Sequence, residues 1–263
     1  MPKRLINDKS QTMQSTPMVH LLLQGKGGVG KSLIASLLAQ FYKDRGVCAI
    51  CVDTDPVCPT FSQYNALGTR YFKVNDRYQI DWRRFDTLIE TILASEDSFI
   101  VDNGPSTFIP LLHYMVDNAL DSVLREANRR LLIHTVITGG QALADTLNGF
   151  DSLAQVCKSR SIVVWINEYF GPVEYDGKNF VQMAAFLKNQ DKVVEVILLP
   201  RFSSGAFDRD MDEMVERKLT FGEISVANGF TLMSERRLRR IQRWIFEQLD
   251  ELNLIRGRQV YGD

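Results

Sequence analysis

The segment 25–32 constrains the fold of this chain more than any other, because it reads Gly-Lys-Gly-Gly-Val-Gly-Lys-Ser. It matches the phosphate-loop pattern G-x-x-x-x-G-K-[ST] and lies between an apolar run at 19–24 and a helical pattern at 32–45. Glycines let consecutive backbone N–H groups converge on phosphate oxygens, and the following helix directs its positive end at the same anion. Such a loop at the first strand-to-helix turn predicts an α/β nucleotide-binding fold.

The rest of the chain alternates short apolar runs with longer segments of helical period, which is typical of an α/β protein. Because no apolar run alternates cleanly with polar residues, we expect strands covered on both faces. Strands are expected at 19–24, 47–53, 99–102, 131–137, 162–166 and 193–199. Helices are expected at 32–45, 81–94, 108–118, 141–156, 180–188, 208–218 and 234–252.

These elements predict a single P-loop domain at 18–254, built on a doubly wound, mostly parallel sheet with helices on both faces. The least regular segment, 54–79, is interpreted as a long functional loop with a short helix. Residues 1–17 carry few apolar side chains and are expected to form a flexible tail, and 255–263 a C-terminal tail.

Charge, hydropathy and cysteine content exclude several classes of protein. The chain has 31 Lys and Arg against 32 Asp and Glu, so only a local basic patch could bind nucleic acid. No apolar run reaches the roughly 18–20 residues of a membrane span, and the N-terminal stretch lacks a signal-like apolar region, so a cytoplasmic location is expected. Cys48 and Cys51 lie three apart in an expected strand and point to opposite faces, which favours buried free thiols over a metal or redox site.

The phosphate loop contains residues with separable chemical roles. Lys31 is the lysine expected to reach the β- and γ-phosphates, and Ser32 supplies a hydroxyl ligand to Mg²⁺. The alternative, a glycine-rich turn without a ligand, is disfavoured by the strand and helix around it. The residues expected to contact the nucleotide are Gly25, Lys26, Gly27, Gly28, Val29, Gly30, Lys31, Ser32 and Leu33.

Carboxylates close two of the expected strands. Asp53 and Asp55 end the strand at 47–53 in the run Asp-Thr-Asp-Pro, and Asp102 ends the apolar strand at 99–102 in the Walker B pattern. Phosphoryl transfer needs acids that hold Mg²⁺ and orient water. Asp53 and Asp55 could instead only cap the strand end, but the phosphate loop beside them favours the functional interpretation.

The run Lys26 to Ser32, K-G-G-V-G-K-S, resembles the signature of the deviant-Walker ATPases, the ParA and MinD family. In that family the first lysine crosses a dimer interface to contact the partner's nucleotide, so the resemblance implies this role for Lys26. It further implies a Mg²⁺-dependent homodimer that binds ATP and ADP and hydrolyses ATP slowly under the control of a partner.

The same resemblance assigns further site residues. Asp55 would position the attacking water, so Lys26, Lys31 and Asp55 are the expected catalytic residues. Asp53 would approach Mg²⁺ through a water, which makes Ser32, Asp53 and Asp102 the expected metal set. Asn167 follows the strand at 162–166 and would read the adenine edge, with Pro200 or Arg201 beside the base.

Three residues depart from the family pattern. The family commonly continues D-T-P-P after its Walker B aspartate, whereas this chain has Asn103 and Gly104. Cys58 stands in switch I where a polar residue such as asparagine is expected. These departures lie where the family's switch contacts and hydrolysis rate are set.

The segments QGKGGVGKS, VDTDPVCPTFSQYNAL, FIVDN and RFSSGAFDRDM are similar to a family of conjugal-transfer proteins encoded in plasmid transfer regions, over about 18–254. The resemblance implies a nucleotide-timed switch that serves plasmid conjugal DNA transfer with a protein partner of that machinery. Two rivals stay open: a nucleotide-binding scaffold without significant hydrolysis, and a ParA-like ATPase for DNA partition or positioning.

The last expected helix, 234–252, is amphipathic. One face carries an apolar stripe, and the other is crowded by Arg236, Arg237, Arg239, Arg240 and Arg243. The basic face could hold DNA phosphates, lie peripherally on the inner membrane or dock a protein partner. The favoured interpretation is a terminal helix packed on the sheet with solvated arginines, because the stripe has the width of a core-facing helix.

Overall fold

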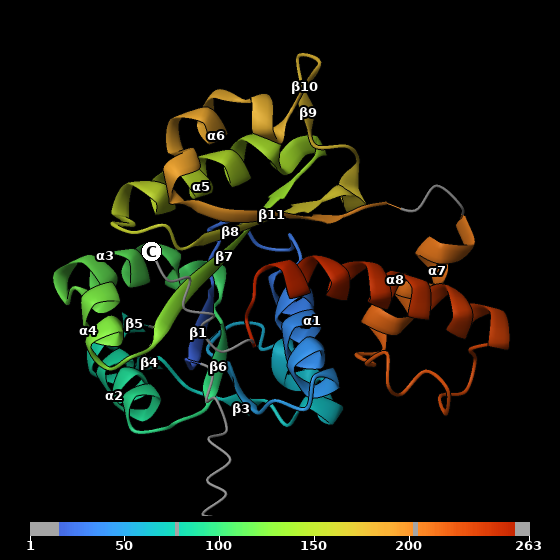
Figure 1. Cartoon of the computed structure of the whole chain (residues 1–263), viewed down its shortest axis with the longest axis horizontal. Coiled ribbons are helices and arrows are strands. Elements are labelled where there is room, and N and C mark those ends of the chain that lie inside the picture. The colour runs from blue at the N-terminus through green and yellow to red at the C-terminus, as the bar shows by residue number, and fades with distance from the viewer. Residues whose placement is uncertain (1–15, 77–78, 202–204, 256–263) are drawn as a thin grey trace, which may run out of the picture.

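The computed structural model describes residues 16–76, 79–201 and 205–255, and its framework is a parallel sheet of seven strands (Figure 1). The strand order is β11-β8-β7-β1-β6-β2-β3, and every neighbouring pair is parallel. The strands are β1 (Met18–Leu22), β2 (Ala49–Asp53), β3 (Arg70–Tyr71), β6 (Ser98–Asp102), β7 (Arg130–Thr138), β8 (Ile162–Asn167) and β11 (Val193–Leu199). The predicted parallel α/β sheet is confirmed.

Helices cover both faces of this sheet, as predicted for a doubly wound fold (Figure 1). Side chains of α1 (Lys31–Asp44), α7 (Gly205–Glu216) and α8 (Leu232–Glu251) form the core on one face. The opposite core is built by α2 (Trp82–Leu93), α3 (Phe108–Asp117), α4 (Leu120–Glu126), α5 (Leu143–Val156) and α6 (Ala184–Asn189). The central strands are buried on both faces, which explains their continuous apolar sequences.

Several short elements differ from the prediction. The segment expected as a long loop contains the edge strand β3 and two 3-10 turns, Phe61–Gln63 and Asn65–Leu67. Helix α4 and the hairpins β4 (Asn75–Asp76) with β5 (Gln79–Ile80) and β9 (Glu174–Tyr175) with β10 (Lys178–Asn179) were not predicted. The second hairpin has a recognisable signal, because Asp176 and Gly177 both have positive φ, 51° and 68°, as a type I′ turn requires.

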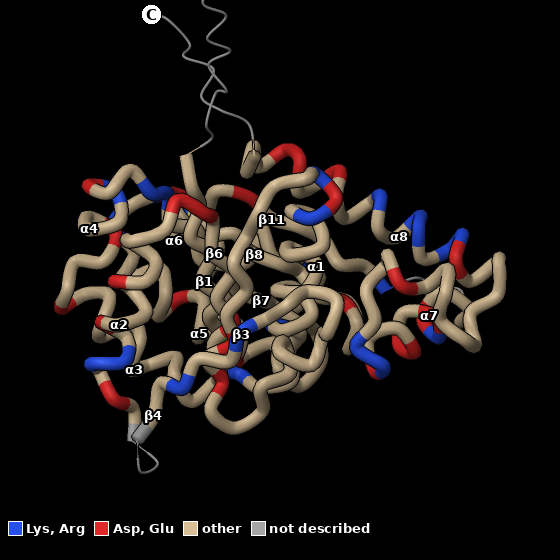
Figure 2. The backbone as a smooth tube through the Cα atoms, turned by 90° about the horizontal axis from the view of Figure 1, so that it is seen from below, with Lys and Arg blue, Asp and Glu red and all other residues tan. Residues whose placement is uncertain are grey.

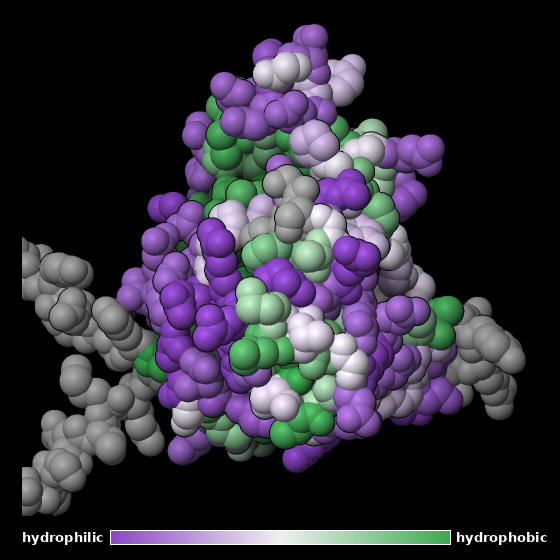
Figure 3. Space-filling view, turned by 90° about the vertical axis from the view of Figure 1, so that its right-hand side faces the viewer, coloured by the Kyte–Doolittle hydropathy of each residue, from purple (hydrophilic) through white to green (hydrophobic). Residues whose placement is uncertain are grey.

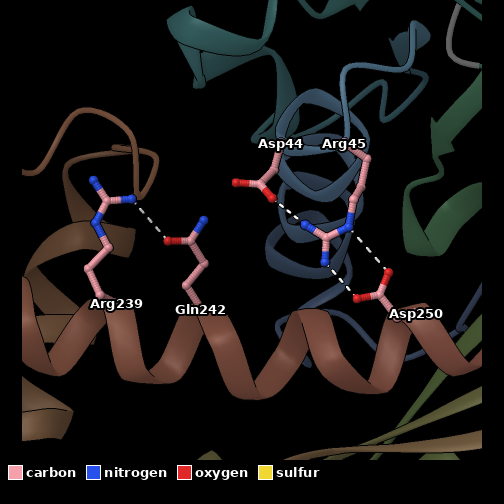
Figure 4. A network of polar contacts seen from close by, with 5 residues as sticks. All are labelled: Asp44, Arg45, Arg239, Gln242 and Asp250. Carbon is pink, nitrogen blue, oxygen red and sulfur yellow. Dashed lines mark hydrogen bonds and ion pairs between the residues drawn. The ribbon is translucent and has the colours of Figure 1, made fainter.

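Helix α8 packs its apolar stripe on the core, so the interpretation of a packed terminal helix is confirmed. The stripe residues Leu238, Ile241, Ile245 and Leu249 are buried. Arg45, at the end of α1, lies between Asp44 and Asp250 and fixes the C-terminal half of α8 to α1 (Figure 4). Because the stripe is buried, this helix cannot insert it into a bilayer.

The outer face of α8 is basic (Figure 2). Arg236, Arg240 and Arg243 are exposed, and among the described residues none of them has an ion-pair partner. Figure 3 views the side of the molecule that α7 and α8 form, where hydrophobic side chains reach the surface in separate groups among hydrophilic ones. Within the described ranges, no helix combines the length and apolar character that a membrane crossing requires.

The predicted domain limits stay a prediction. Residues 1–15 of the expected N-terminal tail and 256–263 of the expected C-terminal tail lie outside the described residues.

Candidate nucleotide-binding site

The predicted site residues meet because parallel strands present their carboxyl ends at one edge of the sheet. The phosphate loop follows β1, Asp53 ends β2 and Asp102 ends β6. Asp102 is in register with Asp53 on one side and with Leu22, just before the loop, on the other. The backbone topology therefore brings the loop and the two carboxylates together from segments far apart in the sequence.

The loop has the geometry that its glycines suggest. Gly28 and Gly30 have φ of 73° and 104°, in the left-handed region that favours glycine, and Gly30 caps the N-terminus of α1. The first turn of α1 carries no acidic residue, so no side chain of that turn neutralises the positive end of the helix dipole. Lys31 is buried, and its ammonium donates to the carbonyl of Lys26 at 3.3 Å. Burial lowers the pKa of Lys31, while Asp102 and Asp55 act in the opposite direction.

Asp102 and Ser32 form the part of the site that suits a metal ion. Asp102 is buried close enough to the Ser32 side chain for that hydroxyl to act on its pKa, yet among the described residues its Oδ1 has no partner. Burial raises the pKa of Asp102 to about 7; Asp53 and Asp55 add to this, whereas Ser32 and Lys31 oppose it. An unpartnered buried carboxylate oxygen beside a hydroxyl is a hard-oxygen pair that fits Mg²⁺.

The rest of a Mg²⁺ coordination shell would have to come from phosphates and water. Among the described residues, no group of three or more His, Cys, Asp and Glu side chains is arranged to hold a metal ion. Mg²⁺ is commonly bound by one or two carboxylates together with substrate phosphates, and this pair beside a phosphate loop matches that arrangement.

Asp53 holds the backbone of the segment 54–62 that follows β2, which we call switch I. Its carboxylate oxygens accept N–H groups of Asp55 at 3.0 Å and of Ser62 at 2.9 Å, and the side chain is fully buried. Burial raises its pKa, and these two hydrogen bonds oppose that shift. The structure thus gives Asp53 the task of shaping the loop after β2, and its contact with Mg²⁺ stays a prediction.

Asp55 lies beside the site and is held by its own loop. Its Oδ1 accepts the N–H groups of Val57 at 2.9 Å and Cys58 at 3.1 Å. The carboxylate lies against Gly104, on the segment after β6. The predicted role of Asp55 in positioning the attacking water stays a prediction, and sequence reasoning missed its contact with Gly104 because the two residues are distant in the sequence.

Lys26 points to a neighbouring helix. Its Nζ lies 2.7 Å from Oδ2 of Asp145 on α5, and both side chains are partly exposed. Asp145 was not predicted, since no local pattern links it to the loop. The predicted role of Lys26 across a dimer interface stays a prediction.

A cavity of about 590 Å³ extends from the loop along α1 to α7 and α8. Its wall contains the residues predicted to face the base, Asn167, Pro200 and Arg201, together with Leu33 of α1. The Asn167 carboxamide bridges the wall and the loop, because its Nδ2 donates to the carbonyl of Val29 at 2.9 Å. The cavity is also lined by residues that sequence reasoning missed, including Tyr169, Phe170, Asp208, Met211, Asp212 and Ile245.

The shape and lining of this cavity suit a nucleoside. Apolar side chains of α1, α7 and α8 offer a surface for a base, and carboxylates and the Asn167 amide supply polar contacts. The loop forms one end of the cavity through Gly28 and Gly30, so a base in the cavity would leave its phosphates at the N-terminus of α1.

The family model described as the CobQ/CobB/MinD/ParA nucleotide binding domain matches residues 21–235. Two Escherichia coli proteins, both called Protein TraL, are 43% and 41% identical to this chain over 233 residues. Each match covers 88% of this chain and 97% of the relative.

Solved structures show the same fold at low sequence identity. A chain of the MinC–MinD cell division protein complex of Aquifex aeolicus matches with a TM-score of 0.53 and 11% identity, over 94% of this chain and 98% of that one. A putative plasmid partition protein of Borrelia burgdorferi, bound to AMPPNP, matches with a TM-score of 0.51 and 14% identity, over 90% of this chain and 98% of that one.

Proposed function

This chain belongs to the CobQ/CobB/MinD/ParA nucleotide-binding family, with the TraL proteins among its relatives, and on that premise we propose that it is a slow Mg²⁺-dependent ATPase acting as a dimeric switch. We place this switch in the cytoplasm, in plasmid conjugal DNA transfer, together with a protein partner of the transfer machinery. The observation that carries the proposal is the unpartnered Asp102 carboxylate oxygen beside Ser32, next to the phosphate loop.

Each site residue has a separate role in the proposed reaction. Backbone N–H groups of the loop and the Lys31 ammonium bind the phosphates, and Ser32 and Asp102 hold Mg²⁺. The metal ion, when bound, neutralises charge on the phosphate oxygens. Asp55 orients the attacking water from the far side of the γ-phosphate, and Asn167 with Pro200 and Arg201 contacts the base. Support for this division comes from the common edge of the sheet on which these residues lie.

In the proposed dimer, Lys26 contacts the nucleotide of the partner subunit. A second ammonium near the transferring phosphoryl group stabilises the charge that develops there, as an arginine finger does. The support is the position of Lys26: it lies in the loop but is exposed, and it pairs with Asp145 through an ion pair that solvent can reach. ATP would favour the dimer, and hydrolysis would release it.

The test is the mass in solution, measured by light scattering without nucleotide, with ADP and with ATP and Mg²⁺. We expect wild type to dimerise only with ATP, and Lys26→Ala to stay monomeric in all three conditions while still binding ATP. A mass that nucleotide does not change, in a protein that binds ATP, would contradict the dimeric switch. Binding of ATP without turnover would favour the nucleotide-binding scaffold.

The exposed arginines of α8 favour a second candidate, a partition-type ATPase that holds DNA. Because Arg236, Arg240 and Arg243 lack acidic partners among the described residues, their charge is available to phosphates. The candidate predicts salt-sensitive DNA binding that requires ATP and is lost in an Arg239→Glu/Arg240→Glu variant. Vesicles of anionic lipid are the comparison: binding of wild type to DNA but not to these vesicles would favour DNA, and binding to the vesicles that the variant loses would favour a membrane surface.

A further inference from the structure

The segment directly after Asp102 touches Asp55, the proposed water-orienting residue. We propose that Gly104 is a positioning residue, whose missing side chain sets the place of the Asp55 carboxylate and thereby the rate of ATP hydrolysis. Of the proposed function, the inference uses one part, the role of Asp55 in orienting the attacking water. The placement of switch I by Gly104 is a separate, measurable claim.

The first observation is steric. A Cβ atom on Gly104 would lie 2.6 Å from Cγ and Oδ1 of Asp55 and 2.9 Å from Oδ2. Gly104 has φ −66° and ψ 157°, an extended conformation that any residue adopts. Glycine is therefore needed at this position for space and not for backbone freedom.

The second observation is that the Asp55 carboxylate is held from the opposite side. Its Oδ1 accepts the N–H groups of Val57 and Cys58, which closes a tight turn at the start of switch I. The carboxylate thus sits between this turn and the Cα of Gly104. A side chain on residue 104 would push the carboxylate toward the turn or out of it.

The third observation is that Gly104 itself is fixed. Its carbonyl accepts the hydroxyl of Thr107 at 2.7 Å, and the preceding Asn103 is buried. The Asn103 amide donates to the carbonyl of Leu22 at 3.2 Å, and its oxygen accepts the Thr54 hydroxyl at 2.9 Å. Residue 104 therefore cannot retreat easily, so Asp55 would be the group that moves.

The same segment also touches the phosphate loop. Pro105 lies 3.4 Å from the position that a Cβ of Gly27 would take, and Phe108 lies 3.0 Å from that of Gly25. Gly104, on the same segment, contacts Asp55. The segment 103–108 thus joins the phosphate loop to switch I through close approaches at three glycines.

A Gly104→Ala variant tests how a side chain at position 104 displaces the Asp55 carboxylate. The atoms that conflict with the new methyl group belong to the end of one side chain near the surface, so the fold has room to adjust. The Asp55 carboxylate does not keep its place. Gly222→Ala is the matched control, because a Cβ there would meet only the Thr220 hydroxyl at 3.8 Å.

The first experiment measures ATP hydrolysis and binding of a fluorescent ATP analogue by wild type, Gly104→Ala, Asp55→Ala, the double variant and Gly222→Ala. We expect Gly104→Ala to lower kcat at least tenfold with an analogue Kd within threefold of wild type. The double variant should be no slower than Asp55→Ala. A kcat of Gly104→Ala within twofold of wild type would overturn the inference. So would a double variant that is slower than Asp55→Ala by the same factor as Gly104→Ala is slower than wild type.

The second experiment does not depend on hydrolysis, so it decides the inference even if wild type proves inactive and the proposed function fails. Cys58 and Cys48 are exposed, whereas Cys51 and Cys157 are buried. In a Cys48→Ser background, a thiol reagent reports on Cys58, next to the turn that Asp55 closes.

We expect Gly104→Ala and Asp55→Ala each to raise the Cys58 labelling rate at least threefold, and the double variant no further. Gly222→Ala should label at the background rate. Unchanged labelling in Gly104→Ala would refute the placement of switch I. Labelling of the two buried thiols as well would indicate general loosening and would also overturn it.

Discussion

The Lys26–Asp145 ion pair determines how readily Lys26 can leave its own subunit. Both side chains are about half exposed, and ion pairs of this kind stabilise a protein by about 0–1 kcal/mol. Such a contact is weak enough for a phosphate of a partner's nucleotide to replace. In the proposed switch, Asp145 therefore tunes the equilibrium between monomer and dimer and does not block it.

An Asp145→Asn variant should dimerise at a lower ATP concentration than wild type. Loss of up to about 1 kcal/mol of competing interaction predicts a shift of about two- to fivefold in the ATP midpoint. Light scattering across an ATP titration measures this shift. Asp151→Asn, on the same helix but paired with Lys188, is the control and should leave the midpoint unchanged. A higher midpoint in Asp145→Asn would mean that Asp145 supports the dimer.

A buried chain of hydrogen bonds crosses the core beneath α1. Trp165 Nε1 donates to Nδ1 of His134 at 2.9 Å, which leaves the hydrogen of His134 on Nε2. His134 then donates to Nδ1 of His20 at 2.8 Å, and His20 Nε2 donates to the Tyr42 hydroxyl at 2.8 Å. Both imidazoles are thus neutral and satisfied. Burial lowers the pKa of His20 to about 3 and lowers that of His134 as well.

The two histidines should therefore make the protein less stable as the pH falls below 6.5, whereas the raised pKa values of Asp102 and Asp53 act in the opposite direction. The unfolded chain binds protons on these histidines near pH 6.5, whereas the folded chain binds none until far lower pH, so stability falls as pH falls. Each histidine contributes up to about 1.4 kcal/mol per pH unit between pH 6.5 and 4.5. Denaturant unfolding across this range should show a smaller slope in His20→Gln. The exposed His113→Gln should follow wild type, and equal slopes in all three proteins would contradict this assignment.

From the sequence, one could predict where residues at fixed places in a motif lie in the fold, while their roles stay predictions. Lys31, Ser32 and Asp102 were predictable because a phosphate loop and a strand-ending aspartate have defined positions in a parallel sheet. Asp145 and Gly104 were not, because each meets its partner through tertiary packing. Asp145 lies 119 residues from Lys26, and no periodicity encodes such a contact.

At the scale of elements, the edge strand β11 is protected by a side chain of α8. The Gln248 carboxamide accepts the N–H of Leu198 at 2.8 Å and donates to its carbonyl at 3.1 Å. This pairing mimics a neighbouring strand at an exposed edge of the sheet, a place where chains otherwise associate. Gln248 thus joins α8 to the sheet in addition to the buried apolar stripe.

Gln248→Ala should lower the free energy of unfolding by about 1–3 kcal/mol, because two backbone groups of β11 lose their partner. Chemical denaturation measures the loss. Gln242→Ala, on the same helix, is the matched control, because within the described part of the chain Gln242 bonds only the exposed Arg239, and its loss should change stability by less than about 0.5 kcal/mol. Equal stability of the two variants would show that water replaces Gln248 at the edge.

The elements that were predicted are those long enough to carry a pattern. Strands such as β7, with nine residues, form long buried runs, and helices such as α2, with buried Phe85, Leu88, Ile89 and Ile92, have clear helical periodicity. Strands of two residues, such as β3, have none. Their existence depends on the neighbour they pair with, here the end of β2 at Val52 and Asp53.

At the scale of the whole molecule, the nucleotide site adjoins both cores. Val29 and Ile34, in and after the phosphate loop, belong to the core on the α1 face. Phe108, which lies against Gly25, belongs to the core on the opposite face. A ligand bound at the loop therefore touches structure on both sides of the sheet, and its binding energy stabilises the folded molecule as a unit.

Mg²⁺ with ADP should raise the unfolding temperature, and the two loop lysines should differ in this effect. At a ligand concentration of 100 times Kd the expected stabilisation is about 2.7 kcal/mol, or about 5–10 °C for a domain of this size. Lys31→Ala should lose most of the shift, since its buried ammonium lies at the N-terminus of α1. Lys26→Ala should keep it, because Lys26 is directed to Asp145 and, in the proposed dimer, acts on the partner's nucleotide. Calorimetry with and without Mg²⁺–ADP measures both shifts, and an equal loss in the two variants would place Lys26 on its own nucleotide.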